Sequence, residues 1–409
     1  MRLWKTAKIL DESHITTVLI LPAGSKNDTF PHAHHLLEHL ILEMEMPNGI
    51  TLREYLDIKG IESRAATSRD LITFAFISPA TKQHACFIEE VFSNIRSSQW
   101  DKKTESSVVS TLENEMFAIP SNMIKAARIS AEFSYWGEVA NLDPSYVHTT
   151  MNKVSKQLPS YLMTLINKSL ILIDDPTNLL YESMLNKITT VEDSSHKSES
   201  CEAPFQNQNT AFQVPARPTN LTSIVFGLRR KLSTLEQLSM LAVSYSLSRG
   251  MRNGILWHDI QAKQLALYHL LAWFQATSSD AILTVDWISL PDKELLVKHA
   301  VLNILNQLTK NPNLLKKELP FAIKDIRAQG QTVKEMPVVE RLKAMAPEIL
   351  DGNDNPSYEG LFSQVDKITV NTCLNLLTEF MESPLLFINQ KGRAQFQKNI
   401  EGHKYEFNN

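Results

Sequence analysis

The sequence predicts an α+β protein made of two homologous halves. Short segments rich in β-branched and apolar residues alternate with longer segments that have helical periodicity. The order of these segments in residues 1–190 returns in residues 221–409, which indicates a duplication. Between the halves, residues 191–220 are dominated by Ser, Glu, Gln, Asn and Pro and offer little that could form a core. We therefore expect two domains, 1–190 and 221–409, joined by a linker.

Length and composition agree with this organisation. The chain has 409 residues, of which 43% are hydrophobic and 21% charged, enough for two globular domains. The formal net charge of −4 argues against a nucleic-acid-binding protein, which would carry a basic balance or patch. The three cysteines (Cys86, Cys201 and Cys373) are far apart, which indicates free thiols in a reducing compartment. We find no signal-peptide core and no membrane-spanning segment, so we expect a cytoplasmic protein with no membrane partner.

In the first half, the strand expected at residues 15–21 ends at Pro22-Ala23-Gly24. A helix follows at about residues 31–46, with Pro31 suited to its first turn, and a second helix ends at Gly60. That second helix is expected at about residues 51–59. The remaining elements expected here are helices at about residues 79–96, 104–118, 123–135 and 145–166, and strands at 71–77 and 169–173.

The second half repeats this order. A strand and a helix come first, then a pair of strands, then a run of helices, and a closing strand. The expected ranges are 223–228, 234–248, 265–274, 281–290, 292–308 and 384–388.

The most informative motif lies in the first helix, at His35-Leu36-Leu37-Glu38-His39. Residues four apart share one face of a helix, so His35 and His39 can bind one zinc ion through ring nitrogens. Glu38 can reach over the same ion without binding it and take a proton from a zinc-bound water. The order H-x-x-E-H is the inverzincin pattern. The neighbouring His32 and His34 we expect to be solvated residues of the first turn.

A catalytic zinc usually has three protein ligands, so a third is needed. The helix at residues 104–118 carries two candidates, Glu113 and Glu115. Glu115 lies beside the apolar stripe of Val108 and Leu112 and is expected to face inward, where a carboxylate needs a partner or a metal. Glu113 is further round the helix. Both could instead be ordinary surface glutamates.

Together these features resemble the M16 (pitrilysin-like) zinc metallopeptidases, in the short class that includes the mitochondrial processing peptidase β subunit and bacterial relatives. The resemblance rests on the H-x-x-E-H motif, on a glutamate about 76 residues beyond the second histidine, which is Glu115, and on the duplicated halves. It also rests on residues 60–68, which look like the family segment G-x-x-x-N-A-x-T-S.

The resemblance implies two α/β sandwich domains, each a mixed and mainly antiparallel sheet with helices packed on it, that close like a clamshell over a peptide. It implies that zinc is held by His35, His39 and Glu115, with Glu38 as the general base. It also implies that Ala65, Ala66 and Thr67 lie on an edge strand that pairs with an extended peptide substrate.

Three positions depart from the family pattern. Val108 replaces a second acidic residue seven before the zinc glutamate, and Arg64 stands where the family prefers Asn. In the second half, Tyr268 matches a substrate-binding tyrosine, but Gln261 occupies the place of the arginine seven before it. Either a partner subunit supplies the missing group, or Lys263 or Arg252 replaces it. Tyr268 could also be a strand residue of the core.

The sequence thus predicts a zinc endopeptidase that cleaves short or unfolded peptides, for example a precursor or leader peptide, and that forms a homodimer or a heterodimer with a related subunit. The rival hypothesis is a non-catalytic subunit of the same fold that binds a peptide or a partner. A third is a structural protein without metal, in which the histidines are incidental.

Overall fold

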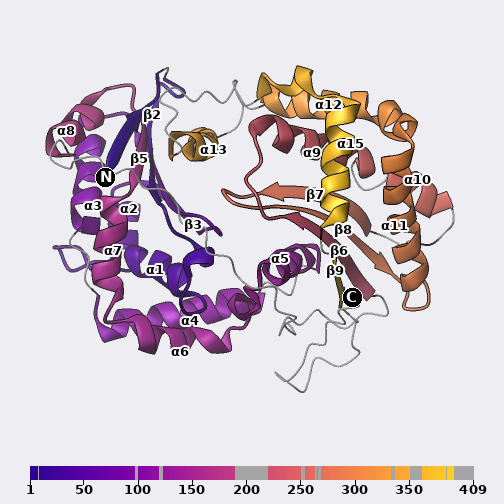
Figure 1. Ribbon diagram of the computed structural model, residues 1–409. Coiled ribbons are helices and arrows are strands. Elements are labelled where there is room, and N and C mark those ends of the chain that lie inside the picture. The colour runs from indigo at the N-terminus through magenta and orange to yellow at the C-terminus, as the bar shows by residue number, and fades with distance from the viewer. Residues whose placement is uncertain are drawn as a thin grey trace. The chain divides into compact units, whose positions relative to one another are not determined.

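The computed structural model describes residues 1–7, 9–96, 100–118, 123–188, 220–249, 254–262, 265, 269–332, 337–350, 362–383 and 385–390. Within these residues the chain forms two compact units, each with its own sheet (Figure 1). Each unit is described by itself below.

The sheet of unit 1 contains five strands among the described residues, in the order β1-β5-β2-β4-β3. Strands β1 and β5 are parallel, and all other neighbours are antiparallel. Strand β2 is central and buried along nearly its whole length, whereas β3 is an edge strand whose residues alternate between exposed and half-buried. The strands are β1 (Arg2–Lys5), β2 (His14–Leu21), β3 (Glu62–Thr67), β4 (Ile72–Pro79) and β5 (Leu170–Asp174).

Helices cover this sheet. On one face, α13 packs through Leu342 and Ala346 against Val18, Ile20 and other apolar residues of β2 and β5. Residues 145–166, expected as one helix, form two, because Pro159 in the first turn of α7 has no N–H to continue the hydrogen-bond ladder of α6. The helices assigned to unit 1 are α1 (Ala33–Leu42), α2 (Leu52–Ile58), α3 (Lys82–Arg96), most of α4 (Lys102–Ala118), α6 (Ser145–Val154), α7 (Leu158–Asn167), α8 (Leu179–Ile188) and α13 (Val338–Leu350).

Unit 2 has an antiparallel sheet in the order β7-β8-β6-β9 among the described residues. Its strands are β6 (Asn220–Leu228), β7 (His269–Ala276), β8 (Ala281–Ser289) and β9 (Leu385–Gln390). Its helices are α5 (Met123–Trp136), α9 (Thr234–Leu247), α10 (Ile255–Ala262), α11 (Glu294–Lys310), α12 (Pro312–Thr332) and α15 (Val370–Glu382).

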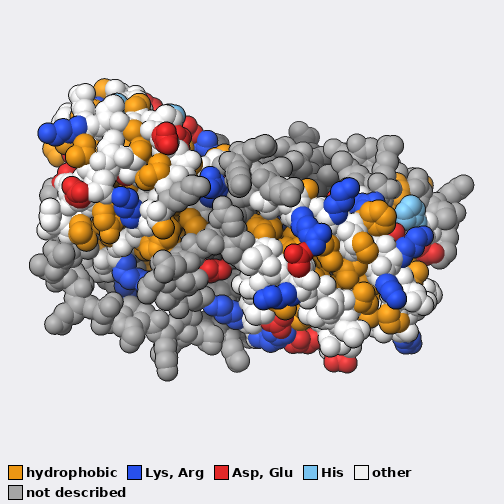
Figure 2. Space-filling view, turned by 90° about the horizontal axis from the view of Figure 1, so that it is seen from above, with side chains coloured by type: hydrophobic (Ala, Val, Ile, Leu, Met, Phe, Trp, Pro, Cys, Tyr) orange, Lys and Arg blue, Asp and Glu red, His pale blue; other side chains and the backbone are white. Residues whose placement is uncertain are grey.

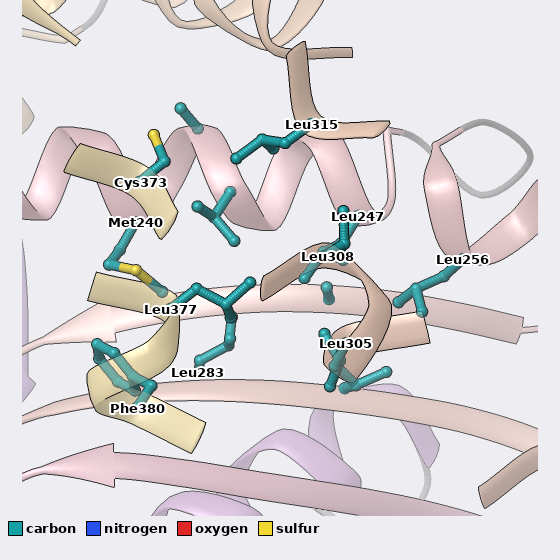
Figure 3. Packing of buried hydrophobic residues seen from close by; sticks show 14 of the residues in the cluster. Met240, Leu247, Leu256, Leu283, Leu305, Leu308, Leu315, Cys373, Leu377 and Phe380 are labelled. Carbon is teal, nitrogen blue, oxygen red and sulfur yellow. The ribbon is translucent and has the colours of Figure 1, made fainter. Parts of the chain in front are cut away.

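The core of unit 2 lies between one face of this sheet and a group of helices (Figure 3). Met240 of α9, Leu377 of α15 and Leu283 of β8 meet there, and all three are fully buried. On the opposite face, α5 packs on β6 with the ring of Tyr135 directly over Gly227, where a Cβ atom would collide with it. Glycine at this position therefore lets the helix approach the sheet.

The expected fold class is confirmed, since each unit is a mainly or wholly antiparallel sheet with helices packed on it. The two units do not coincide with the two halves of the sequence on either side of the linker. Helix α5, from the first half of the sequence, belongs to unit 2, and α13, from the second half, belongs to unit 1. The expected linker, apart from Asn220, lies at residues outside the described part, so the domain boundaries at 190 and 221 stay a prediction.

The described helices, one face of the surface and the cysteines can be compared with the expectations from composition. No described helix combines the length and apolar character needed to cross a membrane. On the face in Figure 2, side chains of Lys and Arg are scattered among apolar, acidic and uncharged groups. Cys86 is exposed and Cys373 is buried, each as a free thiol, and Cys201 lies outside the described residues.

Candidate metal centre

The H-x-x-E-H stretch forms α1, as expected, although the helix is shorter than predicted at both ends. Its leucines and isoleucine are almost completely buried, so the helix is surrounded by protein along most of its length. At its start, His32 adopts the left-handed backbone conformation (φ 65°), which is uncommon for a residue other than glycine. The carboxylate of Asp28 accepts a hydrogen bond from the backbone N–H of His34 at 2.9 Å and so caps the first turn.

The expectation that His32 and His34 are solvated is wrong, because both are about 97–98% buried. His34 Nδ1 lies 2.5 Å from Asp28 Oδ1, and His34 Nε2 lies 2.8 Å from the hydroxyl of Tyr161 on α7. These partners take the place of water. His34 thus fastens the start of α1 to α7. A capping carboxylate shortly before the helix could have suggested Asp28 from the sequence, whereas nothing local to the motif points to Tyr161.

The two histidines of the motif and Glu115 converge on one point. Glu115 Oε2 lies 3.4 Å from His39 Nε2 and 3.8 Å from His35 Nε2, and the ligand atoms of all three side chains lie within 4.8 Å of one another. Ligands at 2.0–2.2 Å from a tetrahedral zinc ion are about 3.3–3.6 Å apart, so the arrangement is close to that of a zinc site. Glu113, the alternative third ligand, is not part of this cluster.

Burial and charge favour the metal-binding state of His35. Burial, together with the neighbouring His39, lowers the pKa of His35 to about 4, so its ring is neutral near pH 7. Neutral imidazole is the form that binds a metal. His39 Nε2 is buried and has no hydrogen-bond partner in the described part of the chain, an arrangement that a metal ion would satisfy. The donor set of two imidazoles and one carboxylate fits zinc.

Glu115 is more exposed than expected, with 51% of its side chain accessible. The apolar stripe of α4 runs through Val108, Leu112 and Met116, all buried, and Glu115 lies at the border of that stripe rather than within it. The side chain of His35 is also partly accessible, at 25%. One side of the three-residue cluster therefore stays open to solvent, as a catalytic zinc site requires.

Glu38 is buried beside this cluster and accepts a hydrogen bond of 2.6 Å from the hydroxyl of Thr67, the last residue of β3. Burial raises the pKa of the Glu38 carboxyl, while the hydrogen bond from Thr67 and the nearby His39 oppose that change. The sequence suggested Thr67 as a substrate-binding residue, but its contact with Glu38 was not expected.

Ala65, Ala66 and Thr67 lie at the end of β3, in register with Phe74, Thr73 and Ile72 of β4. Strand β3 is at the edge of the sheet, as the resemblance implied, and its outer side has no strand partner among the described residues. It can therefore accept a further strand. Tyr268, Lys263 and Arg252 lie outside the described residues, and so does the side chain of Gln261.

Comparison with known proteins identifies the fold. Neither a family model nor a curated protein sequence matches the chain. Several solved structures match it. A protease from Helicobacter pylori superposes with a TM-score of 0.74 and 13% identity, covering 95% of this chain and 96% of that one. A candidate M16-like peptidase from Alicyclobacillus acidocaldarius gives 0.74 and 11%, covering 95% and 94%.

The chain has the fold of the M16-like peptidases. An inactive M16 peptidase domain from Pseudomonas fluorescens is also similar, with a TM-score of 0.70 and 13% identity, covering 98% of this chain and 96% of that one. The M16-like fold is therefore shared by proteases and by an inactive domain, and activity has to be judged from the site residues.

Proposed function

We propose that this protein is a zinc-dependent endopeptidase. The observation that carries the proposal is the convergence of His35, His39 and Glu115 on one point, next to the buried carboxylate of Glu38. A chance cluster of surface residues would not be expected to include a buried imidazole nitrogen that, among the described residues, makes no hydrogen bond, as at His39.

In this proposal His35, His39 and Glu115 hold the metal. A zinc ion bound there would polarise the scissile carbonyl and lower the pKa of water at the site. Glu38 acts as the general base, taking a proton from the attacking water onto its carboxylate and later passing it to the leaving amine. Its burial favours this role, because the raised pKa makes the carboxylate a better proton acceptor than a solvated one.

The substrate in this proposal is a peptide in extended conformation. The outer edge of β3, at Ala65, Ala66 and Thr67, would form main-chain hydrogen bonds with it. Such pairing favours a short or unfolded substrate, because most segments of a folded protein are already held in its own structure. Processing of a precursor or leader peptide would suit this preference. Tyr268 remains a predicted substrate-binding residue.

A dimer, with a second copy or a related subunit, and a cytoplasmic location also remain predictions. The alternative is a non-catalytic subunit that binds a peptide or a partner. Two observations favour it. One is the fold shared with an inactive M16 domain, and the other is the apolar, buried Val108 in place of an acidic residue of the family pattern. The two hypotheses predict different effects of replacing Glu38 on peptide cleavage.

The test uses the purified full chain, with zinc measured by elemental analysis and cleavage followed on a library of unstructured peptides. We expect about one zinc per chain in the wild type and none in His35→Ala. The wild type should cleave peptides and His35→Ala should not. Glu38→Gln should keep the zinc and lose about a hundredfold or more in turnover. Zinc binding without cleavage, both alone and with candidate partner subunits, would favour the non-catalytic subunit. Absence of zinc after metal addition would refute the proposal.

A further inference from the structure

The hydrogen bond between Thr67 and Glu38 joins two parts of the proposed site that are 29 residues apart in sequence. Glu38 belongs to α1, which carries the histidines, and Thr67 ends the edge strand β3. We propose that Thr67 is a positioning residue, which holds the carboxylate of Glu38 in place and links the base to the strand on which a substrate would dock. This inference rests on the proposed function and adds a residue to it.

Thr67 is the hydrogen-bond partner of Glu38 in the described part of the chain. Among the described residues, the hydrogen bonds to the Glu38 carboxylate come from Thr67. A glutamate side chain has three rotatable bonds, so it does not keep one orientation without a restraint. The hydroxyl of Thr67 restrains it by donating to one carboxylate oxygen, Oε2, at 2.6 Å, and the backbone of Thr67 acts on the same carboxylate.

Thr67 is itself held firmly. It pairs with Ile72 of β4, and the turn that follows closes with a 2.8 Å hydrogen bond from Ser68 N to Leu71 O. That turn is fastened to the loop after β2 by Ser25 N, which donates to Ser68 O at 3.1 Å, and by an ion pair of 2.5 Å between Lys26 and Asp70.

Gly24 lies within this loop against the carbonyls of the turn, so close that a Cβ atom would collide with them. The β-branched side chain of Thr67 adds its own restriction at χ1. Thr67 is therefore a rigid support, as a positioning residue must be.

The position of Thr67 gives this support a second consequence. A peptide paired with the outer edge of β3 would align with Ala65 and Ala66, and the next residue of the same strand holds the base. Any movement of the strand end on docking would be transmitted to Glu38 through a bond of 2.6 Å. Loss of the hydroxyl should therefore affect the chemical step and leave docking, which uses main-chain groups, nearly unchanged.

The experiment compares Thr67→Val, which keeps shape and β-branching but has no donor, with Thr67→Ser, which keeps the hydroxyl. Thr17→Val is the control, because Thr17 is a threonine in a strand of the same sheet, although more deeply buried than Thr67, and its hydroxyl has no hydrogen-bond partner in the described part of the chain. We expect Thr67→Val to bind zinc normally, to keep its KM and to lose about tenfold to hundredfold in kcat. Thr67→Ser should recover most of that loss.

Crystal structures of the same variants, with and without zinc, give a readout that does not depend on activity. The Glu38 carboxylate should leave its position in Thr67→Val and keep it in Thr67→Ser and Thr17→Val. If Glu38 stays in place in Thr67→Val, or if kcat is unchanged in an active enzyme, the positioning role is refuted. If the wild type cleaves no peptide, the proposed function fails, while the position of Glu38 in the crystals still decides the role of Thr67.

Discussion

The anchoring of α1 by Asp28 leads to a quantitative prediction. Asp28 accepts hydrogen bonds from both the backbone and the ring of His34, and their side chains are only 5% and 3% exposed. In Asp28→Ala, the first turn of α1 loses its cap, which costs about 1 kcal/mol. The ring nitrogen of His34 is also left buried without its partner, which costs a further 1–3 kcal/mol or so. The expected loss of stability at this end of α1 is therefore about 2–4 kcal/mol.

The loss should be seen locally, and also in metal binding. Because a chain of two units need not unfold in one step, amide hydrogen exchange in α1 of the zinc-free protein is the best measurement. Since His35 directly follows His34, we also expect zinc affinity, measured by competition with a chelator, to fall about tenfold to hundredfold.

Asp11→Ala is the matched control, because Asp11 forms the same kind of pair with His14 at an exposed site, where the side chains are 32% and 46% accessible. Exposed ion pairs contribute at most about 1 kcal/mol. If Asp28→Ala increases exchange in α1 no more than Asp11→Ala does, the anchoring argument is wrong.

Two further predictions concern unit 2. Burial raises the pKa of Glu132 from 4.5 to about 7, against the opposing charge of Arg128. Between these two pH values the folded chain holds a proton that the unfolded chain has released, so the free energy of unfolding should fall by roughly 3 kcal/mol as the pH rises through this window. Denaturant unfolding at a series of pH values should show this slope for the wild type and lack it for Glu132→Gln; an equal slope in both would exclude Glu132 as its source. Separately, Gly227→Ala places a methyl group against the ring of Tyr135 and should destabilise unit 2 by about 1–3 kcal/mol. A double-mutant cycle with Tyr135→Ala should remove most of that penalty, and additive effects would show that the ring is not the obstacle.

Local patterns were enough to predict that His35, His39 and Glu115 come together; their binding of zinc stays a prediction. The helical spacing of His35 and His39 is independent of the rest of the fold, and the stripe of α4 pointed to Glu115 rather than Glu113. The exposure of Glu115 was predicted wrongly, because a position at the border of a stripe does not determine which way a long side chain turns.

Contacts between distant segments could not be predicted. Tyr161 comes from a helix more than 100 residues after His34, and Thr67 reaches Glu38 only because β3 pairs at the sheet edge. A polar residue in a hydrophobic motif is easily taken for a solvated one when its partner lies elsewhere in the chain. The burial of His32 and His34 is an error of this kind.

The exchange of α5 and α13 between the units has a consequence for any attempt to divide this protein. A gene fragment that ends in the region between the halves would encode the five-stranded sheet without α13, and Val18, Ile20 and Leu172 would lose the cover that this helix provides. The complementary fragment would lack α5 and would leave Val225 and Trp273 exposed in the same way. Each fragment alone would present an apolar sheet face prone to aggregation. A divided chain should remain folded when both fragments are co-expressed, because each fragment then provides the helix that the other lacks.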